Sequence, residues 1–271
     1  MLLINIFKCA ALSVILLFVL SCSGPPESSG ENPASSIFPG LERQTNVEGE
    51  DHVPSPDQLL DDVVTGLPLD SLIITGSLVV RKQRGVVIGD YLFEMLVEWG
   101  GRPPWARYVI KDDDGRILEQ LKVIHSSGSV SDIEYSRGEP SRSAQLTNLT
   151  QLIQNTDISW MDLTLSFLWW RGGKITGEEE IKGFDCYIVD VPRPSGVECE
   201  YAYVRLWIEK KIRVLLQAEG YDSEGDIIRR LWIKSCKKID DRWMIKDMEI
   251  QGNPAEHRTK LRVKAVEVSE Q

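Results

Sequence analysis

Long runs of alternating apolar and polar residues, joined by short turn signals, constrain the fold of this 271-residue chain more than any other feature. Three of the runs read SLIITGSLVVRKQ, VVIGDYLFEMLVEW and WARYVIKDDDGRILEQLKVIHSS, and the last has Asp113–Asp114–Gly115 as a hairpin turn. Further turns are indicated at residues 192–196 and 223–225. We expect about ten to eleven strands in sequential antiparallel order. Many long strands with short turns predict a strongly curved sheet or a barrel.

The alternation is interrupted at residues 145–170, which contain QLTNLTQLIQ, helical in composition, and then ISWMDLTLSFLWW. Two periods compete in the second stretch. The helical period groups Ile158, Met161, Leu165 and Leu168, whereas the strand period groups Met161, Leu163, Leu165, Phe167 and Trp169. Thr156–Asp157 can cap a helix here, and we favour the helical interpretation. Its apolar residues are either ordinary core or the cover of a surface that holds an apolar ligand.

A second helix is predicted at about residues 56–66. Ser55 occupies the capping position, Pro56 the first turn and Gln58 the third position before LLDDVV, which is the pattern of a capped helix start. The helix is expected to end near Gly66 and Pro68.

The first 21 residues have the character of a secretory signal, with Lys8 followed by an apolar run that is too short to span a membrane. Val19-Leu20-Ser21-Cys22 resembles the bacterial lipobox, in which a peptidase cuts before the cysteine and the cysteine is acylated. We therefore expect a lipoprotein signal peptide at residues 1–21 and lipidation at Cys22, which would attach the protein to a membrane. A plain signal peptide and an uncleaved anchor are the alternatives. Ser23 after the cysteine resembles an outer-membrane export signal.

Residues 22–54 are rich in Ser, Pro, Gly and Glu and are expected to form a disordered tether before a domain of residues 55–271. The formal net charge of the chain is −10. This acidic balance gives no indication of nucleic-acid binding, which calls for a basic face. It also leaves membrane attachment to the lipid anchor, because anionic lipids repel an acidic domain.

Catalytic and metal-binding motifs are absent from the sequence: it contains no GxSxG, HExxH, P-loop or GxGxxG pattern. His125 and His257 lie in β-type segments and are interpreted as surface or satisfied strand histidines. Cys186 and Cys199 flank a predicted turn, so a cross-strand disulfide is conceivable, although a turn near Pro194 would place them on opposite faces. We predict no enzyme activity, no metal and no cofactor.

Several stretches resemble the outer-membrane lipoprotein-sorting family, the LolA/LolB-like proteins, in a branch of largely uncharacterised bacterial members. The resemblance spans about residues 59–268 and rests on SWMDLTLSFLWW, KGFDCYIVDVPRP, YVRLWIEKKIRVLLQAEGYDSEGDIIRRLWI, KKIDDRWMIKDMEI and HRTKLRV. It implies a mainly β fold with some α: an unclosed antiparallel half-barrel, its concave face covered by helices. It also implies a hydrophobic cavity that receives lipoprotein acyl chains. The motifs single out neither the soluble carrier nor the lipid-anchored receptor of that system.

On this resemblance, ISWMDLTLSFLWW would belong to a lid over the cavity. The candidate lining residues are Trp160, Met161, Leu165, Leu168 and Trp169 from the lid and Tyr187, Tyr203, Trp207 and Trp232 from strands. A register error of one residue would turn each strand candidate outward.

The function implied is that of an outer-membrane-anchored lipoprotein whose domain faces the periplasm. It would bind acyl chains of lipoproteins or lipids and take part in lipoprotein sorting or lipid transfer, together with other sorting components. The alternative is a non-transporting envelope lipoprotein that uses the same fold as a protein-binding module.

Overall fold

The computed structural model describes residues 37–39, 53–128, 130–239 and 241–269, all within the compact unit of residues 32–271. The predicted signal peptide, Cys22 and most of the predicted tether lie outside the described residues. Among the residues described, no helix has both the length and the apolar character needed to cross a membrane.

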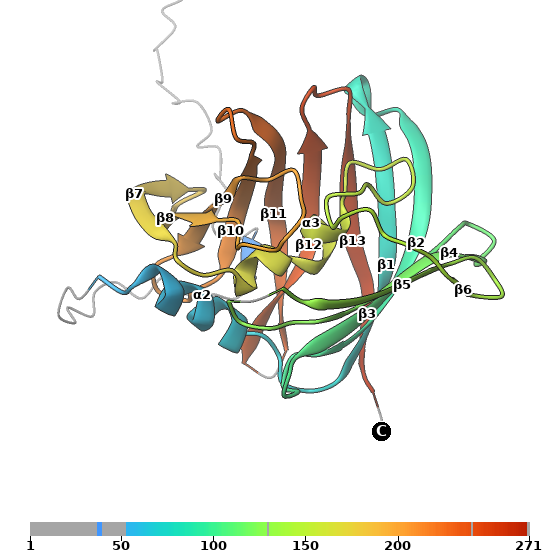
Figure 1. Ribbon diagram of the computed structural model, residues 1–271, viewed down its shortest axis with the longest axis horizontal. Helices are drawn as coiled ribbons and strands as arrows, with labels where there is room; N and C mark the ends of the chain where they lie inside the picture. Colours follow the sequence, from blue (N-terminus) through green and yellow to red (C-terminus); the bar gives the residue numbers. More distant parts are fainter. Residues whose placement is uncertain (1–36, 40–52, 129, 240, 270–271) are drawn as a thin grey trace, which may run out of the picture. The chain divides into compact units, whose positions relative to one another are not determined.

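The domain is built on one antiparallel sheet of 13 strands that does not close (Figure 1). The strands are β1 (Leu72–Lys82), β2 (Val87–Glu98), β3 (Trp105–Lys111), β4 (Ile117–Ile124), β5 (Asp132–Arg137), β6 (Arg142–Ser143), β7 (Lys174–Ile181), β8 (Phe184–Pro192), β9 (Tyr203–Glu209), β10 (Leu215–Tyr221), β11 (Ile227–Ile239), β12 (Arg242–Gly252) and β13 (His257–Val268). The prediction of a mainly β, unclosed antiparallel sheet is confirmed. The expected number of strands was too low, because the two edge strands, β6 and β7, are short or rich in glutamate and lack a clear strand pattern.

The first strand lies in the middle of the sheet. The strand order is β6-β5-β4-β3-β2-β1-β13-β12-β11-β10-β9-β8-β7, so the first and last strands pair with each other. β1 is in register with β2 on one side and β13 on the other over nearly its whole length. The register shifts at Gly76, where a Cβ atom would lie 2.1 Å from the Arg262 carbonyl oxygen and 2.5 Å from the Phe93 ring. Glycine is therefore required at this bulge.

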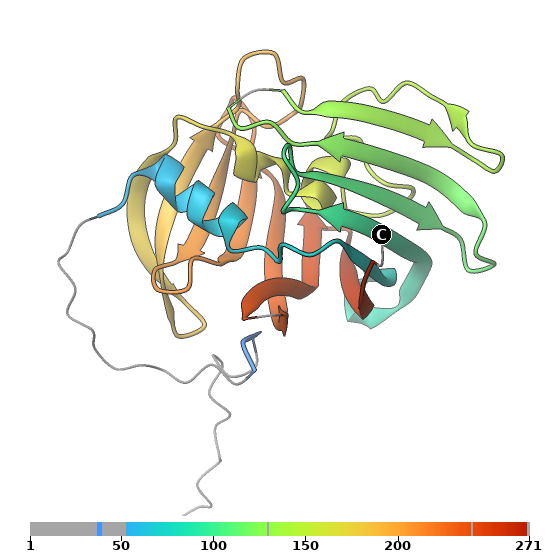
Figure 2. The same ribbon diagram turned by 90° about the horizontal axis from the view of Figure 1, so that it is seen from below.

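In the described part of the chain, the helical elements named beside the sheet are α2 (Pro56–Thr65), η1 (Gln83–Gly85), α3 (Trp160–Thr164) and η2 (Ser166–Trp169). The predicted N-terminal helix is confirmed as α2, and the Ser55 hydroxyl caps it by accepting from the Gln58 backbone N–H at 3.2 Å. Its buried side is formed by Leu59, Leu60 and Val63, and it packs against η2 (Figure 2). α2 and α3 lie on the concave side of the sheet.

Residues 144–173 run from one edge of the sheet, β6, to the other edge, β7, and we call them the crossing segment. Residues 145–154 do not form the helix that their composition suggested. Instead, Gln154 adopts a left-handed conformation (φ 48°), and the backbone turns so that Ile153 N donates to Ile158 O at 2.9 Å. The predicted helix at residues 158–170 is confirmed only as α3 and η2, because Leu165 at φ 49° separates the two.

The cap of α3 is Ser159 rather than Thr156 or Asp157. The Ser159 hydroxyl accepts from the Asp162 backbone N–H at 3.2 Å, while the Asp162 carboxylate accepts from the Ser159 backbone N–H at 2.9 Å. These reciprocal bonds form a capping box. The Thr156 hydroxyl instead donates to the Ile153 carbonyl in its own turn, and the Asp157 carboxylate accepts from the Thr259 hydroxyl of β13.

A short part of the predicted tether packs on the domain. Ile37 and Phe38 are completely buried. The Phe38 ring makes edge-to-face contacts with Phe184 and Trp243, with ring centroids 5.1 and 4.9 Å apart. In the ribbon, residues 37–39 lie on the other side of the sheet from α2 (Figure 2). The N-terminal region therefore contributes to the packing of β8 and β12.

Replacing Phe38 with Ala should lower the free energy of unfolding by about 3 kcal/mol, the lower end of the range for a buried phenylalanine. Urea denaturation of the full-length chain measures this. Val53→Ala is the control, because Val53 is 57% exposed and should leave the unfolding midpoint unchanged. Equal midpoints for the two variants would contradict the packing of Phe38.

Candidate functional site

An apolar cavity of about 230 Å³ lies on the concave side of the sheet, beneath α2 and the crossing segment. Its lining combines strand side chains that alternate toward the concave face with side chains from the two covers. They include Ile74, Met95, Tyr108, Met248, Leu261 and Val263 from the sheet, Val63 from α2, and Leu163, Leu165, Leu168 and Trp169 from the crossing segment. Three charged residues, Arg213, Asp241 and Arg242, also contribute to the lining. Since ligand pockets commonly measure about 300–1,000 Å³, this cavity holds only part of an acyl chain unless a cover moves.

Five of the candidate lining residues come from the crossing segment, and they divide into two groups. Leu165, Leu168 and Trp169 line the cavity. Trp160 and Met161 are completely buried but lie outside its lining. Trp160 packs edge-to-face on Tyr135, with ring centroids 6.0 Å apart. These two residues therefore belong to the core that supports the crossing segment.

None of the four strand candidates is part of the cavity lining. Gln217 pairs in register with both Trp207 and Trp232, so these three side chains share one face of the sheet. That face is the outer one, because Leu206 and Leu231, on the opposite face, are buried in the core. The placement of Trp207 and Trp232 inside the cavity is therefore wrong by one residue of register.

Tyr203 and Tyr187 are placed by other contacts. The Tyr203 ring stacks on Tyr221 with centroids 4.6 Å apart, on the outer face as well. Tyr187 lies beside the cavity rather than in its lining, with the Arg213 guanidinium 5.6 Å from its ring centroid. The Trp207 indole N–H donates to Glu179 at 2.8 Å, which explains why a tryptophan is tolerated on the outer face.

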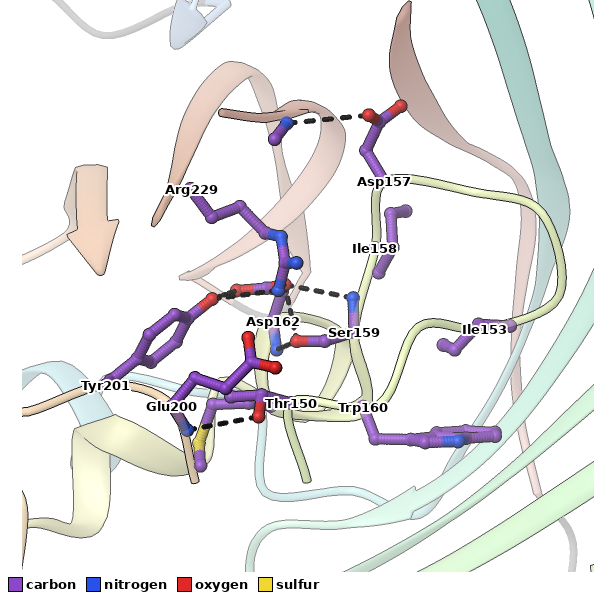
Figure 3. A network of polar contacts seen from close by, with 12 residues as sticks. Thr150, Ile153, Asp157, Ile158, Ser159, Trp160, Asp162, Glu200, Tyr201 and Arg229 are labelled. Atoms are coloured by element: carbon purple, nitrogen blue, oxygen red, sulfur yellow. Dashed lines mark hydrogen bonds and ion pairs between the residues drawn. The ribbon is translucent and has the colours of Figure 1, made fainter. Parts of the chain in front are cut away.

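A buried ion pair fixes α3 to the sheet (Figure 3). Arg229 Nη1 lies 3.3 Å from Asp162 Oδ2 and 3.1 Å from the Tyr201 hydroxyl, which in turn donates to Asp162 Oδ1 at 3.0 Å. The Arg229 and Asp162 side chains are only 8% and 5% exposed. Burial alone would lower the pKa of Arg229, but Asp162 and Tyr201 raise it above its usual value, so the guanidinium stays charged. Gly220 is required here, since a Cβ would lie 2.4 Å from the Tyr201 ring.

A second group of polar contacts ties the middle of the crossing segment to β13. Asp157 Oδ2 accepts from the Thr259 hydroxyl at 2.8 Å and lies 2.8 Å from His257 Nδ1. His257 is therefore a hydrogen-bonded strand histidine, as the sequence indicated, and its partner is the Asp157 carboxylate.

A third polar contact reaches the other half of the sheet. There, the buried Glu119 of β4 accepts from the Gln154 side-chain amide at 2.8 Å and from its backbone N–H at 3.2 Å. The crossing segment is thus attached to β4, β11 and β13, in both halves of the sheet.

His125, in contrast, is buried without hydrogen-bond partners for its ring nitrogens among the described residues. Its ring stacks on Trp169 of the cavity lining, with centroids 3.6 Å apart. Burial lowers the pKa of His125 to about 3. The imidazole is therefore neutral at physiological pH and acts as an aromatic packing element.

The described residues include no group of three or more His, Cys, Asp or Glu side chains arranged to hold a metal ion. Cys186, Cys199 and Cys236 are all free, so the conceivable Cys186–Cys199 disulfide is not formed. Burial raises the pKa of Cys186 and of Cys236 to about 12, which keeps both thiols protonated and unreactive.

An open antiparallel sheet with covers over an apolar concave face is the fold of the LolA superfamily, which the sequence resemblance implied. A LolA superfamily protein from Nitrosomonas europaea superposes with a TM-score of 0.57 at 13% identity, covering 81% of this chain and 96% of that one. A domain named as an outer membrane lipoprotein-sorting protein, from Vibrio parahaemolyticus, gives a TM-score of 0.65 at 12% identity, with coverages of 79% and 92%.

A DUF1329 family protein from Desulfovibrio piger is also similar, with a TM-score of 0.68 at 17% identity and coverages of 79% and 92%. At these identities the likeness establishes the fold alone. A family model whose description reads "uncharacterized protein" matches residues 138–271, which include the crossing segment and strands β7–β13. No curated protein sequence matches the chain.

Replacing Arg229 with Met should lower the free energy of unfolding by about 3–5 kcal/mol, because Asp162 is left charged and buried. The matched control is Arg116→Met, which removes the ion pairs with Asp112 and Asp114 at a hairpin turn, where Arg116 is 71% exposed. This control should cost about 1 kcal/mol or less. Adding Asp162→Asn to Arg229→Met should recover most of the loss. Equal losses for the two single variants in urea denaturation would contradict the role of the buried pair.

The domain should lose stability in acid through His125. Its folded-state pKa of about 3 lies below the ordinary histidine value of 6.5, so its contribution is complete above pH 6.5 and is lost as the pH falls toward 3. The loss should be about 2 kcal/mol at pH 5, since each pH unit corresponds to about 1.4 kcal/mol. His125→Phe retains the ring and removes the titration, so its unfolding free energy should decline less between pH 7 and pH 5. Identical pH dependence in the two proteins would contradict this assignment.

Proposed function

We propose that this protein binds acyl chains of lipoproteins or lipids in the cavity beneath α2 and the crossing segment, as a carrier or receptor in lipoprotein sorting or lipid transfer. The observation that carries the proposal is the cavity itself: in a domain of this fold, apolar side chains from both halves of the sheet leave a space that the covers do not fill. An apolar cavity with few polar groups suits a hydrocarbon ligand.

Two further observations support a role at the bacterial outer membrane. The lipobox-like sequence that ends at Cys22 supplies a membrane anchor. A structural relative is named as an outer membrane lipoprotein-sorting protein domain. We propose attachment to the outer membrane through lipidated Cys22, with the domain in the periplasm.

The cover that moves on ligand binding is α2 rather than the crossing segment. The crossing segment is held by buried polar contacts, and breaking one buried ion pair costs about 3–5 kcal/mol. α2 is held by partly exposed ion pairs, Asp61 with Arg171 and Asp62 with Arg213, each worth about 1 kcal/mol or less. Displacing α2 transfers Leu59, Leu60 and Val63 from the core to the ligand or to solvent. An acyl chain that takes their place restores much of the apolar contact.

A protein-binding module is the second candidate, and one observation favours it. The β1–β2 hairpin presents Val86, Val87 and Ile88, which are 60%, 51% and 47% exposed. Consecutive exposed apolar residues at a hairpin tip provide a surface for contact with another molecule.

The two candidates are distinguished by photolabelling of the full-length protein in phosphatidylcholine vesicles with a diazirine-bearing hexadecanol. Binding in the cavity should concentrate adducts on peptides that contain residues 163–169 and 212–215. Label confined to the hairpin at residues 86–88 would favour the binding module and overturn the carrier proposal.

Leu165→Glu should reduce labelling of the cavity peptides about tenfold, because a carboxylate in the apolar lining disfavours a hydrocarbon chain by more than about 1.4 kcal/mol. The matched control is Leu152→Glu, in the same crossing segment but 42% exposed and outside the lining. It should label like the wild type. Circular dichroism confirms that both variants are folded before labelling is compared.

A further inference from the structure

One charged side chain in the cavity lining has an unmet hydrogen-bonding group. Arg213 lines the cavity, and its Nη1 atom is buried without a hydrogen-bond partner among the described residues. An N–H group of a charged guanidinium that is removed from water and left unpaired is costly. The side chain as a whole is 27% exposed, so it lies at the mouth of the cavity, with one end accessible to solvent.

The backbone of the β9–β10 turn holds Arg213 in this position. Arg213 adopts φ 54°, a left-handed conformation that is uncommon for residues other than glycine, asparagine and aspartate. The turn that precedes it is closed by the buried Glu209 carboxylate, which accepts from the backbone N–H groups of Lys211 and Ile212 at 2.7 and 2.5 Å. Strain of this kind is retained where the surrounding structure fixes it, and it is frequent at ligand sites.

A second arginine in the cavity lining, Arg242, has hydrogen-bond partners for its guanidinium. Its Nη1 donates to the backbone carbonyls of Thr65 and Leu67 at the end of α2. Arg213 has a carboxylate nearby in Asp62 of α2, yet Arg213 Nε lies 3.5 Å from Asp62 Oδ2. A charge-assisted hydrogen bond is shorter, about 2.7–2.9 Å. The Arg242 guanidinium thus bonds the end of α2, whereas Arg213 has an N–H donor that can still bond a ligand in the cavity.

We propose that Arg213 recognises the head group of an anionic single-chain amphiphile, a carboxylate or a phosphate, whose hydrocarbon chain occupies the cavity. This proposal rests on acyl binding in the cavity and adds the class of ligand. The guanidinium presents paired N–H donors that fit the oxygens of a carboxylate or phosphate. The limited volume favours one chain, and the partial exposure of Arg213 lets the head group remain near solvent.

The same contact couples the ligand to the cover. The Arg213–Asp62 ion pair links the β9–β10 turn to α2, so an anion bound to Arg213 competes with Asp62 for one guanidinium. Binding of the head group therefore weakens the attachment of α2 while the chain replaces its apolar contacts. A neutral amphiphile replaces the apolar contacts of α2 but does not compete with Asp62 for Arg213.

The test compares diazirine-bearing hexadecanoic acid, hexadecyl phosphate and hexadecanol on the full-length protein in phosphatidylcholine vesicles. The readout is the ratio of acid to alcohol labelling, and of phosphate to alcohol labelling, on the cavity peptides. Wild-type protein should favour the anionic probes about tenfold, as expected for a charge-assisted hydrogen bond. The relative yields of the acid and the phosphate identify which head group is preferred.

Arg213→Gln should bring both ratios close to one, whereas Arg230→Gln, which removes a positive charge on the outer face, should leave them unchanged. Asp62→Asn should raise the ratios, because it frees Arg213. Arg213→Lys, which retains the charge, should keep part of the preference. Equal labelling of the cavity by all three probes in wild-type protein would overturn the anionic preference and leave acyl binding intact. Absence of cavity labelling by every probe would overturn both.

Discussion

The ion pair between Asp162 and Arg229 is the interaction on which the concave side of the domain depends. Because β1 lies in the middle of the sheet, the chain must pass from one edge to the other, and it does so across the apolar face. A segment placed there must satisfy its backbone and side-chain polar groups internally. Asp162 does this by joining the cap of α3, the hydroxyl of Tyr201 and the guanidinium of Arg229. The crossing segment is therefore a fixed wall, and the cavity is the space that remains beside it.

The two covers of the cavity consequently differ in how firmly they are held. Breaking the buried pair that holds the crossing segment costs several times more than breaking an exposed pair of α2. Arg213 belongs to both the cavity and the attachment of α2, which is why a single side chain links recognition of a ligand to opening. A cover held by weak polar bonds and by apolar contacts, which a hydrocarbon chain can replace, suits reversible binding.

Local sequence patterns predicted the parts of this fold that depend on local physics. The alternation identified the long strands, and Ser55 and Gln58 marked the start of α2. The same patterns missed β7, whose three glutamates disfavour a strand assignment, and they placed Trp207 and Trp232 on the wrong face, because register is set by pairing with distant strands. Asp162 could have been suspected, since an acid in an apolar run requires a buried partner. The sequence could not have identified Arg229 as that partner, because Arg229 is 67 residues away from Asp162.

The free edges of the sheet carry a consequence for how copies of this molecule meet. An unpaired strand edge is a template on which another chain can add a strand, and a sheet that stays open has two of them. Here one edge is the two-residue β6, and the other is β7, with Glu178, Glu179 and Glu180 in succession. Two copies approaching through β7 would bring like charges together, which opposes edge-to-edge stacking. The glutamates of β7, which have low strand propensity, thus disfavour polymerisation through the open edge of the sheet.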